Sequence, residues 1–230
     1  MPRMPKWMGD AVENLMASKF LTVTVTHVEY LSREVKRVCF AGDLSRADCF
    51  PGYAVSFRVS ALDHKDYTPV VFTKDTCEII FHIHGNGPGS AFADNLQVGD
   101  STKMLIPRGR KLYREGGDHF FFGDESSIGT CKAIMQEVPC AGIFELDEAN
   151  WEVLGKLEMQ VDVVHKHHGN IVAALDKHTL HKEMTYVLTG KAASIQVFRK
   201  LLKERGVSSS QMIIKAYWVA EKHKRGSFAT

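Results

Sequence analysis

The stretch that decides the fold is Lys-Asp-Tyr-Thr-Pro-Val-Val-Phe at residues 65–72, followed by His-Gly-Asn-Gly-Pro-Gly-Ser-Ala at residues 84–91. The first segment is typical of a strand and places the ring of Tyr67 beside the hydroxyl of Thr68. The second is a glycine-rich turn that opens a helix, where unpaired backbone N–H groups can hold a pyrophosphate. An aromatic ring, a hydroxyl at its edge and an anion-binding turn together predict a flavin site.

Each segment also has an ordinary structural interpretation. Tyr67 and Thr68 could be a strand pair with the tyrosine packed and the threonine solvated. Residues 87–91 could be a strand-to-helix turn in which Ser90 caps the helix. The second interpretation is compatible with anion binding, because a capped helix start is what an anion uses.

Length and composition fit a soluble enzyme of two modest domains or one large one. The chain has 230 residues, a hydrophobic content of 44% and a formal net charge of +2, which is too balanced for a nucleic-acid-binding face. Asp10, Glu13 and Asn14 interrupt the first 20 residues, so no signal peptide is expected. No window approaches eighteen apolar residues, so no membrane span is expected. Five scattered cysteines favour a reducing, cytoplasmic location over a disulfide framework or a zinc site. They are Cys39, Cys49, Cys77, Cys131 and Cys140.

The first half of the chain has the period-two pattern of strands. The expected strands are Leu21–Val28, Glu34–Phe40, Tyr53–Val59, Tyr67–Phe72 and Cys77–His84. A helix over about residues 90–96 and a sixth strand at Thr102–Ile106 complete a predicted small antiparallel β-barrel. The polar, glycine-punctuated segment Arg108–Gly117 is the predicted linker.

The second half alternates strands with helices. His119–Phe122 is continuously apolar, as in a strand buried on both faces of a parallel sheet, and a helix is expected over Ser126–Glu137. Later strands are expected at Gly142–Leu146, Leu157–Val164, Met184–Leu188 and Met212–Trp218, with helices at Ile171–Leu175 and Ala192–Arg205. This order predicts a doubly wound α/β parallel sheet, in which ligands lie beyond the carboxyl ends of the strands.

Seven short blocks carry a family resemblance over about residues 20–226. They are Lys65-Asp66-Tyr67-Thr68, His84-Gly85, Gly87-Pro88-Gly89-Ser90, Gly99-Asp100, Pro107-Arg108-Gly109, Gly123-Asp124-Glu125-Ser126 and Tyr217-Trp218. In this order they resemble the siderophore-interacting proteins, which are FAD-dependent ferric-siderophore reductases within the ferredoxin-reductase superfamily. The Gly-Asp-Glu-Ser block and the late Tyr-Trp separate this family from ordinary ferredoxin reductases.

The resemblance implies an FAD-binding β-barrel domain at residues 18–110 and an NAD(P)H-binding α/β domain at residues 117–230. It implies that electrons pass from NAD(P)H, or from a reduced ferredoxin-like carrier, through the flavin to a ferric siderophore, with release of Fe(II). Two alternatives remain open: a general flavin or electron-carrier reductase, and a non-catalytic module that binds flavin or siderophore. No Ser-His-Asp or Cys-His arrangement indicates hydrolysis.

The resemblance also implies site residues. Tyr67 and Thr68 are the expected catalytic residues, with Thr68 hydrogen-bonded to flavin N5. The expected cofactor-binding residues are Lys65, Tyr67, Thr68, Pro69, His82, His84, Gly85, Gly87, Pro88, Gly89, Ser90, Ala91, Asp124, Glu125, Ser126 and Trp218. Trp218 is equally consistent with a core position. No metal ligand is expected, because no carboxylate or cysteine accompanies His82 and His84.

Departures from the family pattern affect the expected phosphate contacts. Lys65 stands where the family has Arg, and a point ammonium lacks the bidentate fork of a guanidinium, so weaker FAD affinity is expected. The family's Arg after the Tyr-Thr pair is missing, so Arg108 or Arg110 is expected to supply charge. Gly129 lies near the place where the family commonly has a proline.

The sequence leaves the electron donor open. The basic cluster His165–His168 could receive an adenosine 2′-phosphate, which would indicate NADPH. Glu145, near the end of a predicted strand, could instead hold a ribose diol as in NAD enzymes. Asp124 and Glu125 place negative charge where a phosphate would approach, so this loop is expected to face a nicotinamide or ribose. As helix-start carboxylates they are equally consistent with dipole partners.

Overall fold

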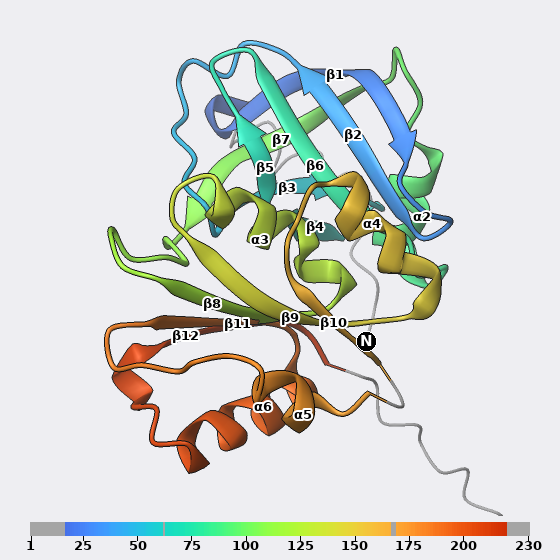
Figure 1. The fold of residues 1–230 in the computed structure, drawn as a ribbon. Helices are drawn as coiled ribbons and strands as arrows, with labels where there is room; N and C mark the ends of the chain where they lie inside the picture. The colour runs from blue at the N-terminus through green and yellow to red at the C-terminus, as the bar shows by residue number, and fades with distance from the viewer. Residues whose placement is uncertain (1–16, 62, 167–168, 220–230) are drawn as a thin grey trace, which may run out of the picture.

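The computed structural model describes residues 17–61, 63–166 and 169–219. Two sheets follow one another along the chain (Figure 1). An antiparallel sheet of seven strands is formed by the first half, and a parallel sheet of five strands is formed by the second half. The described residues contain no helix long and apolar enough to cross a membrane.

The antiparallel sheet has the strand order β4-β3-β7-β1-β2-β6-β5. Its strands are β1 (Phe20–Tyr30), β2 (Val35–Ala41), β3 (Tyr53–Arg58), β4 (His64–Tyr67), β5 (Pro69–Phe72), β6 (Thr76–His82) and β7 (Ser101–Gly109). A short 3-10 turn, η1 (Ala17–Lys19), precedes them, and helix α2 (Gly87–Asn95) lies between β6 and β7.

The strands of the antiparallel sheet do not pair continuously around a closed barrel, contrary to the prediction from the sequence. The edge strands β4 and β5 follow each other in the chain, but no pairing joins them in the described part of the structure. The expected strand Tyr67–Phe72 is broken at Thr68, because Pro69 has no N–H to donate to a ladder and the pairing with β6 shifts register between Pro69 and Val71. The antiparallel sheet is confirmed, whereas the barrel closure is not.

The parallel sheet has the order β10-β9-β8-β11-β12, and each of its pairings is parallel. Its strands are β8 (His119–Gly123), β9 (Cys140–Leu146), β10 (Asp162–His165), β11 (Thr185–Lys191) and β12 (Met212–Trp218). Its helices are η2 (Glu125–Ser127), α3 (Ile128–Met135), η3 (Glu148–Asn150), α4 (Trp151–Lys156), α5 (Ile171–Leu175), α6 (Ala192–Glu204) and η4 (Ser209–Gln211).

Helices cover both faces of the parallel sheet, which confirms the doubly wound prediction. Helices α3 and α4 lie on the side toward the antiparallel sheet, and α5 and α6 lie on the opposite side (Figure 1). The chain builds outward from β8 to β10 and then returns to the other side of β8 with β11 and β12. The strand order therefore reverses between β8 and β11, and this is the switch point at which ligands of such sheets bind.

The expected strand Leu157–Val164 is wrong over its first five residues. Helix α4, which the sequence pattern did not predict, ends at Lys156, and a turn with Glu158 at φ 53° follows. Leu157 and Met159 are buried by packing into a core cluster from this turn. Their alternation with polar residues mimicked a strand.

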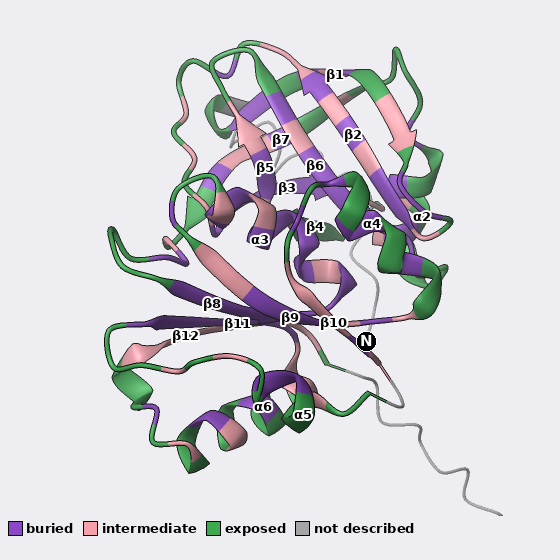
Figure 2. Ribbon diagram, in the orientation of Figure 1, coloured by how far each residue is buried: buried purple, intermediate pink, exposed green. Residues whose placement is uncertain are grey.

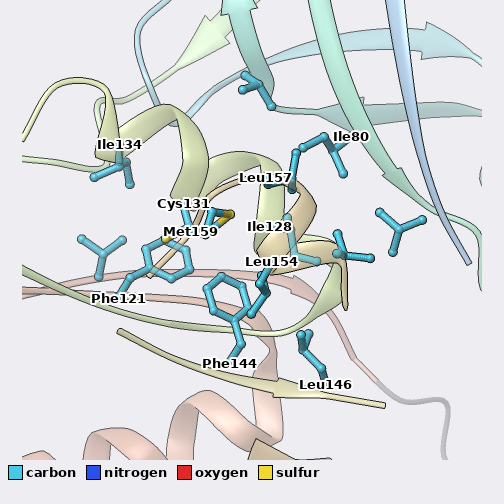
Figure 3. Packing of buried hydrophobic residues seen from close by; sticks show 14 of the residues in the cluster. Ile80, Phe121, Ile128, Cys131, Ile134, Phe144, Leu146, Leu154, Leu157 and Met159 are labelled. Atoms are coloured by element: carbon cyan, nitrogen blue, oxygen red, sulfur yellow. The ribbon is translucent and has the colours of Figure 1, made fainter. Parts of the chain in front are cut away.

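One hydrophobic core joins the two halves. Strands β8 and β11 are buried along their whole described length except at Lys191 (Figure 2). The cluster above them contains Phe121 and Phe144 from the parallel sheet, Ile128 from α3, and Val70 and Ile80 from the antiparallel sheet (Figure 3). Other clusters fill the antiparallel sheet and the layer beneath the parallel sheet. The expected division at residues 110–117 stays a prediction, and a single packed cluster extends across it.

Candidate flavin site

Tyr67 at the end of β4 connects the antiparallel sheet to the start of α2. Its ring packs edge-on against Phe81 with ring centroids 4.6 Å apart, and its hydroxyl donates to the carbonyl of Gly89 at 3.2 Å. Burial raises the pKa of Tyr67 to about 12, so the phenol stays protonated and keeps this bond near neutral pH. Tyr67 is therefore a fixed aromatic wall beside the helix start.

The turn before α2 is open on its outer side. Gly85 and Gly87 have φ angles of 75° and 79°, and a Cβ added to either would meet no atom within 4 Å. The Gly85 N–H donates to the Oγ of buried Ser90 at 3.0 Å, which closes the turn. Pro88 occupies the first turn of α2, where its missing N–H costs no helical bond. This is a glycine turn with free space around it at a helix start.

Lys65 lies along the same helix start. A Cβ added to Gly89 would come within 3.1 Å of Lys65 Cγ and 2.9 Å of the Tyr67 hydroxyl, so a larger residue there would displace one of these two side chains. The stem of Lys65 therefore packs on the backbone of Gly89, and its ammonium is on an exposed residue. Arg110 donates to the carbonyl of Ile214 at 2.7 Å, so its guanidinium is already engaged within the chain.

Thr68, between β4 and β5, meets the carboxyl edge of the parallel sheet. Tyr217 near the end of β12 shares a hydrogen bond of 2.7 Å with Thr130 on α3. Burial raises the pKa of Tyr217, while hydrogen bonds to the hydroxyls of Thr130 and Thr68 oppose the rise. Gly129 on α3 approaches the Thr68 carbonyl, since a Cβ there would lie 3.6 Å from that oxygen. The hydroxyl of Thr68 thus belongs to a cluster built by both halves.

Asp124 fills the switch point between β8 and β11. It is 3% exposed, and it accepts hydrogen bonds from Lys191 N at 2.8 Å, from Trp218 Nε1 at 2.9 Å and from Ser126 N at 3.0 Å. Gly190, at φ 102°, leaves room for this carboxylate, because an added Cβ would lie 2.6 Å from it. The chain's own carboxylate is therefore bound where a dinucleotide phosphate would approach.

Glu125 and Lys166 form a buried ion pair beside Asp124. Lys166 Nζ lies 3.0 Å from Glu125 Oε2, and Glu125 Oε1 also accepts the Asp147 N–H at 2.8 Å. Burial alone would lower the pKa of Lys166, but the carboxylates of Glu125 and Asp147 together raise it. Lys166 is thus committed to internal partners and is a poor candidate for a 2′-phosphate. His167 and His168 of the same predicted cluster lie outside the described residues.

His82 and His84 lie together at the end of β6. Their ring centroids are 5.6 Å apart, with His84 exposed and His82 half-buried. Burial lowers the pKa of His82, and the charge of Glu125 opposes this shift. His82 therefore faces the ion pair of the parallel-sheet half. Among the described residues, no group of three or more His, Cys, Asp or Glu side chains is arranged to hold a metal ion.

Glu145 on β9, the candidate ribose ligand, is half-buried. Burial raises the pKa of its carboxyl group, while a hydrogen bond to Ser194 near the start of α6 opposes the rise. The carboxylate of Asp124 raises the Glu145 pKa further, and Lys191 lowers it. This edge of the sheet is thus rich in internal carboxylates.

Residues 117–221 match the family model described as siderophore-interacting protein. A solved siderophore utilization protein from T. fusca shares the fold at 23% identity and a TM-score of 0.71, over 89% of this chain and 94% of its own. The siderophore-interacting protein of Aeromonas hydrophila shares it at 16% identity and a TM-score of 0.72, over 89% and 93%.

The same fold extends beyond the siderophore-interacting proteins. The flavohem-like FAD/NAD-binding domain of nitric oxide dioxygenase from Vibrio cholerae matches at 15% identity and a TM-score of 0.72, over 86% of this chain and 98% of its own. No curated protein matches the sequence. The chain therefore has a ferredoxin-reductase-like fold, and its residues 117–221 are similar to the siderophore-interacting proteins. The resemblance predicted from the seven blocks is confirmed.

The structure gathers the expected site residues into two clusters. Around Tyr67 lie Lys65, Thr68, His84, Gly85, Gly87, Pro88, Gly89 and Ser90; around the switch point lie Asp124, Glu125, Ser126, Trp218 and, facing them, His82. Pro69 is buried at the start of β5, and Ala91 is exposed on α2. Whether these residues contact a cofactor stays a prediction.

The residues around the two clusters fit the two nucleotides differently. The open turn at Gly85 and Gly87, with Lys65 beside it, fits the diphosphate of FAD. The loop after β8 does not fit the diphosphate of a nicotinamide dinucleotide, because buried Asp124 occupies it with three N–H donors already engaged.

Sequence reasoning missed Tyr217 and Thr130 as partners of Thr68. The alternation of side chains along a strand was a signal that could have separated Tyr217 from Trp218. Because neighbouring side chains in a strand point to opposite faces, these two residues must have different partners. Trp218 donates to Asp124, and cations lie over its ring: the Nζ of Lys191 is 5.3 Å from the ring centroid. Trp218 is thus held by the parallel-sheet half itself.

Proposed function

We propose that this chain is an FAD-dependent oxidoreductase that passes electrons from NAD(P)H, or from a reduced ferredoxin-like carrier, to a ferric siderophore and releases Fe(II). The observation that carries the proposal is the cluster in which Tyr67 bonds to Gly89 beside an open glycine turn and Lys65. The family match and the shared fold support a role in flavin-associated electron transfer.

In this proposal Lys65 and the turn at residues 85–90 hold the diphosphate of FAD, and Tyr67 and Thr68 adjoin the flavin ring. Bound FAD supplies hydride acceptance and one-electron release. The chain supplies position and electrostatics: the Tyr67 phenol stays protonated, and the side chains of Thr68 and Thr130 adjoin the Tyr217 hydroxyl. No general base or nucleophile is required of the protein.

Release of iron follows from the ligand chemistry of the acceptor. Hard oxygen donors hold Fe(III) more tightly than Fe(II), so one electron delivered to a ferric siderophore loosens the metal. A two-electron donor such as NAD(P)H would therefore reduce two ferric siderophores, giving two Fe(II), one NAD(P)⁺ and one proton. A cytoplasmic location is part of the proposal, and the five free cysteines are consistent with that reducing compartment.

Two other functions stay open beside this one. A general flavin or electron-carrier reductase would pass its electrons to a small protein, and its rate should depend strongly on ionic strength. A non-catalytic module would bind flavin or siderophore without turnover. The replacement of the family's arginine by Lys65 favours weak flavin retention in either case.

The decisive experiment is reconstitution of the purified chain with FAD, followed by anaerobic titration with NADH, NADPH and a reduced ferredoxin. We expect a yellow protein whose flavin absorbance bleaches with at least one donor and returns on addition of a ferric siderophore, with Fe(II) trapped by a chelator. Failure to take up FAD in excess would refute the proposal. Uptake without bleaching by any donor would leave only the non-catalytic module.

A matched pair of serine variants tests the pocket itself. Ser90→Ala removes the acceptor that closes the turn to Gly85 N–H and should weaken FAD retention. Ser45→Ala makes the same chemical change at an exposed residue outside the turn and should leave retention unchanged. Equal retention by the two variants would discredit the assigned turn.

A further inference from the structure

Tyr217 occupies an irregular position in the parallel sheet. Strand β12 pairs with β11 in register as far as Gly190, which lies opposite Ala216. The next residue of β11, Lys191, pairs with Trp218, so the ladder passes over Tyr217. One extra residue on one strand is the arrangement of a β-bulge, which re-aims a side chain and is common beside active sites. The Tyr217 phenol is therefore turned by a local feature of the backbone.

Three threonine hydroxyls surround the Tyr217 phenol. Thr130 on α3, the helix between the two sheets (Figure 1), shares a hydrogen bond of 2.7 Å with it. Thr68, between β4 and β5, and Thr189, near the end of β11, adjoin the same phenol. Burial and the negative charge of Asp124 raise the pKa of Tyr217, so the phenol keeps its proton near neutral pH. A neutral phenol can both donate and accept a hydrogen bond.

The fold leaves the hydroxyl of Thr189 unused. Thr189 is fully buried, and its Oγ1 forms no hydrogen bond with any part of the chain that the structure describes. A buried polar group without a partner is costly, and valine would fill nearly the same volume without this cost. Because the hydroxyl adjoins the Tyr217 phenol, it can accept the phenol proton when that proton turns toward it.

A network made of hydroxyl groups can reverse its direction. Each hydroxyl carries one donor and two acceptor positions, whereas a carboxylate only accepts and an ammonium only donates. The nearby carboxylate of Asp124 is already engaged by the N–H groups of Lys191, Trp218 and Ser126. The phenol proton can therefore point along the network toward Thr68 or away from it.

We propose that Tyr217 and Thr189 are positioning residues that let the Thr68 hydroxyl change from hydrogen-bond donor to acceptor when the flavin is reduced. The inference rests on the flavin function proposed above, in which Thr68 adjoins flavin N5. This nitrogen accepts a hydrogen bond in the oxidised ring and donates one in the reduced ring, so a partner that serves both states must change its role.

Each hydroxyl has a defined partner in both states. With oxidised flavin, Tyr217 donates to Thr68, and Thr68 donates to N5. With reduced flavin, Thr68 accepts from N5–H and donates to Tyr217, whose own proton then turns to Thr189. Thr130 donates to the phenol throughout. Thr189 is thus the acceptor that only the reduced state uses.

The test compares Thr189→Val, which removes the hydroxyl, with Thr189→Ser, which keeps it, in the full chain loaded with FAD. Both variants should keep the dissociation constant for oxidised FAD in a fluorescence titration. Reduced FAD should bind about fivefold more weakly to Thr189→Val, because one hydrogen bond is lost. For a two-electron couple this lowers the reduction potential of the bound flavin by about 20 mV, measured anaerobically against a reference dye. Thr189→Ser should keep the potential of the unaltered chain.

Two further readouts separate this role from a structural one. The flavin-free chain does not use the Thr189 hydroxyl, so Thr189→Val should not lower its unfolding free energy in urea. Tyr217→Phe should lower the reduction potential as Thr189→Val does. Tyr186→Phe is the control and should leave the potential unchanged, because Tyr186 is buried in the hydrophobic cluster on the other face of the parallel sheet.

The outcomes distinguish the inference from the function on which it rests. An unchanged potential in Thr189→Val, or a loss of stability in its flavin-free form, would overturn the inference and leave flavin binding intact. Failure of the unaltered chain to bind FAD would refute the proposed function together with the inference.

Discussion

Replacing Asp124 by Asn should destabilise the fold through the switch point. One oxygen of Asp124 accepts the N–H groups of Lys191 and Trp218, and the other accepts the N–H of Ser126. An asparagine amide can accept on one side only, so at least one buried N–H loses its acceptor, at about 1–3 kcal/mol. The remaining two bonds lose the strength that a charged acceptor gives, at about 1 kcal/mol each.

These contributions sum to about 3–5 kcal/mol of unfolding free energy, or about 10 °C in Tm for a chain of this length. Urea denaturation followed by far-UV circular dichroism would measure the change. Because the carboxylate is internal, the loss should be the same with and without saturating FAD. Asp43→Asn, the same change at an exposed residue, is the control and should have little effect. A loss below about 0.5 kcal/mol in Asp124→Asn would refute the reasoning.

Three further changes probe other parts of the molecule. Burial lowers the pKa of His119 from 6.5, and its Nε2 accepts the Arg114 N–H, so the unfolded chain takes up the proton first as the pH falls. The unfolding free energy from urea denaturation should therefore fall as the pH drops below 6.5, and it should fall less steeply in His119→Gln. Equal slopes against pH in the two proteins would contradict this. Tyr67→Phe removes the bond to Gly89, worth about 1 kcal/mol, and should raise the FAD dissociation constant about fivefold in a fluorescence titration; an unchanged constant would exclude this role. Ile80→Ala should cost about 2–5 kcal/mol and leave a single unfolding transition by calorimetry, whereas two resolved transitions would show that the halves unfold separately.

Much of the fold could be predicted from the sequence because its strands carry strong local patterns. The apolar run His119–Phe122 became the buried strand β8, and the alternation of the first half became the antiparallel sheet. Barrel closure was not predictable, because it depends on whether the edge strands meet across Thr68 and Pro69. Helix α4 was missed because it is short and its apolar residues continue into a turn whose alternation is strand-like.

The candidate site was predictable only in part. The pairing of Tyr67 with the glycine turn followed from motifs that lie close in the sequence, and the structure brings them together at Gly89. The role of Asp124 as a cofactor contact stays a prediction. Its hydrogen-bond partners Lys191 and Trp218 come from strands that end 67 and 94 residues later in the chain. Such long-range contacts leave no local pattern. The cluster of Thr68, Thr130 and Tyr217 escaped prediction for the same reason.

The shared hydrophobic cluster beneath α3 bears on how this protein could be altered or exchanged with relatives. Cutting the chain near residue 114 would separate Val70 and Ile80 from Ile128 and Phe144, which pack in the same cluster. Each fragment would then expose a hydrophobic surface to solvent. Chimeras that swap whole halves between relatives should therefore aggregate unless the facing side chains of both parents travel together. The relative placement of the two sheets and the solubility of the chain are in this way inherited as a single unit.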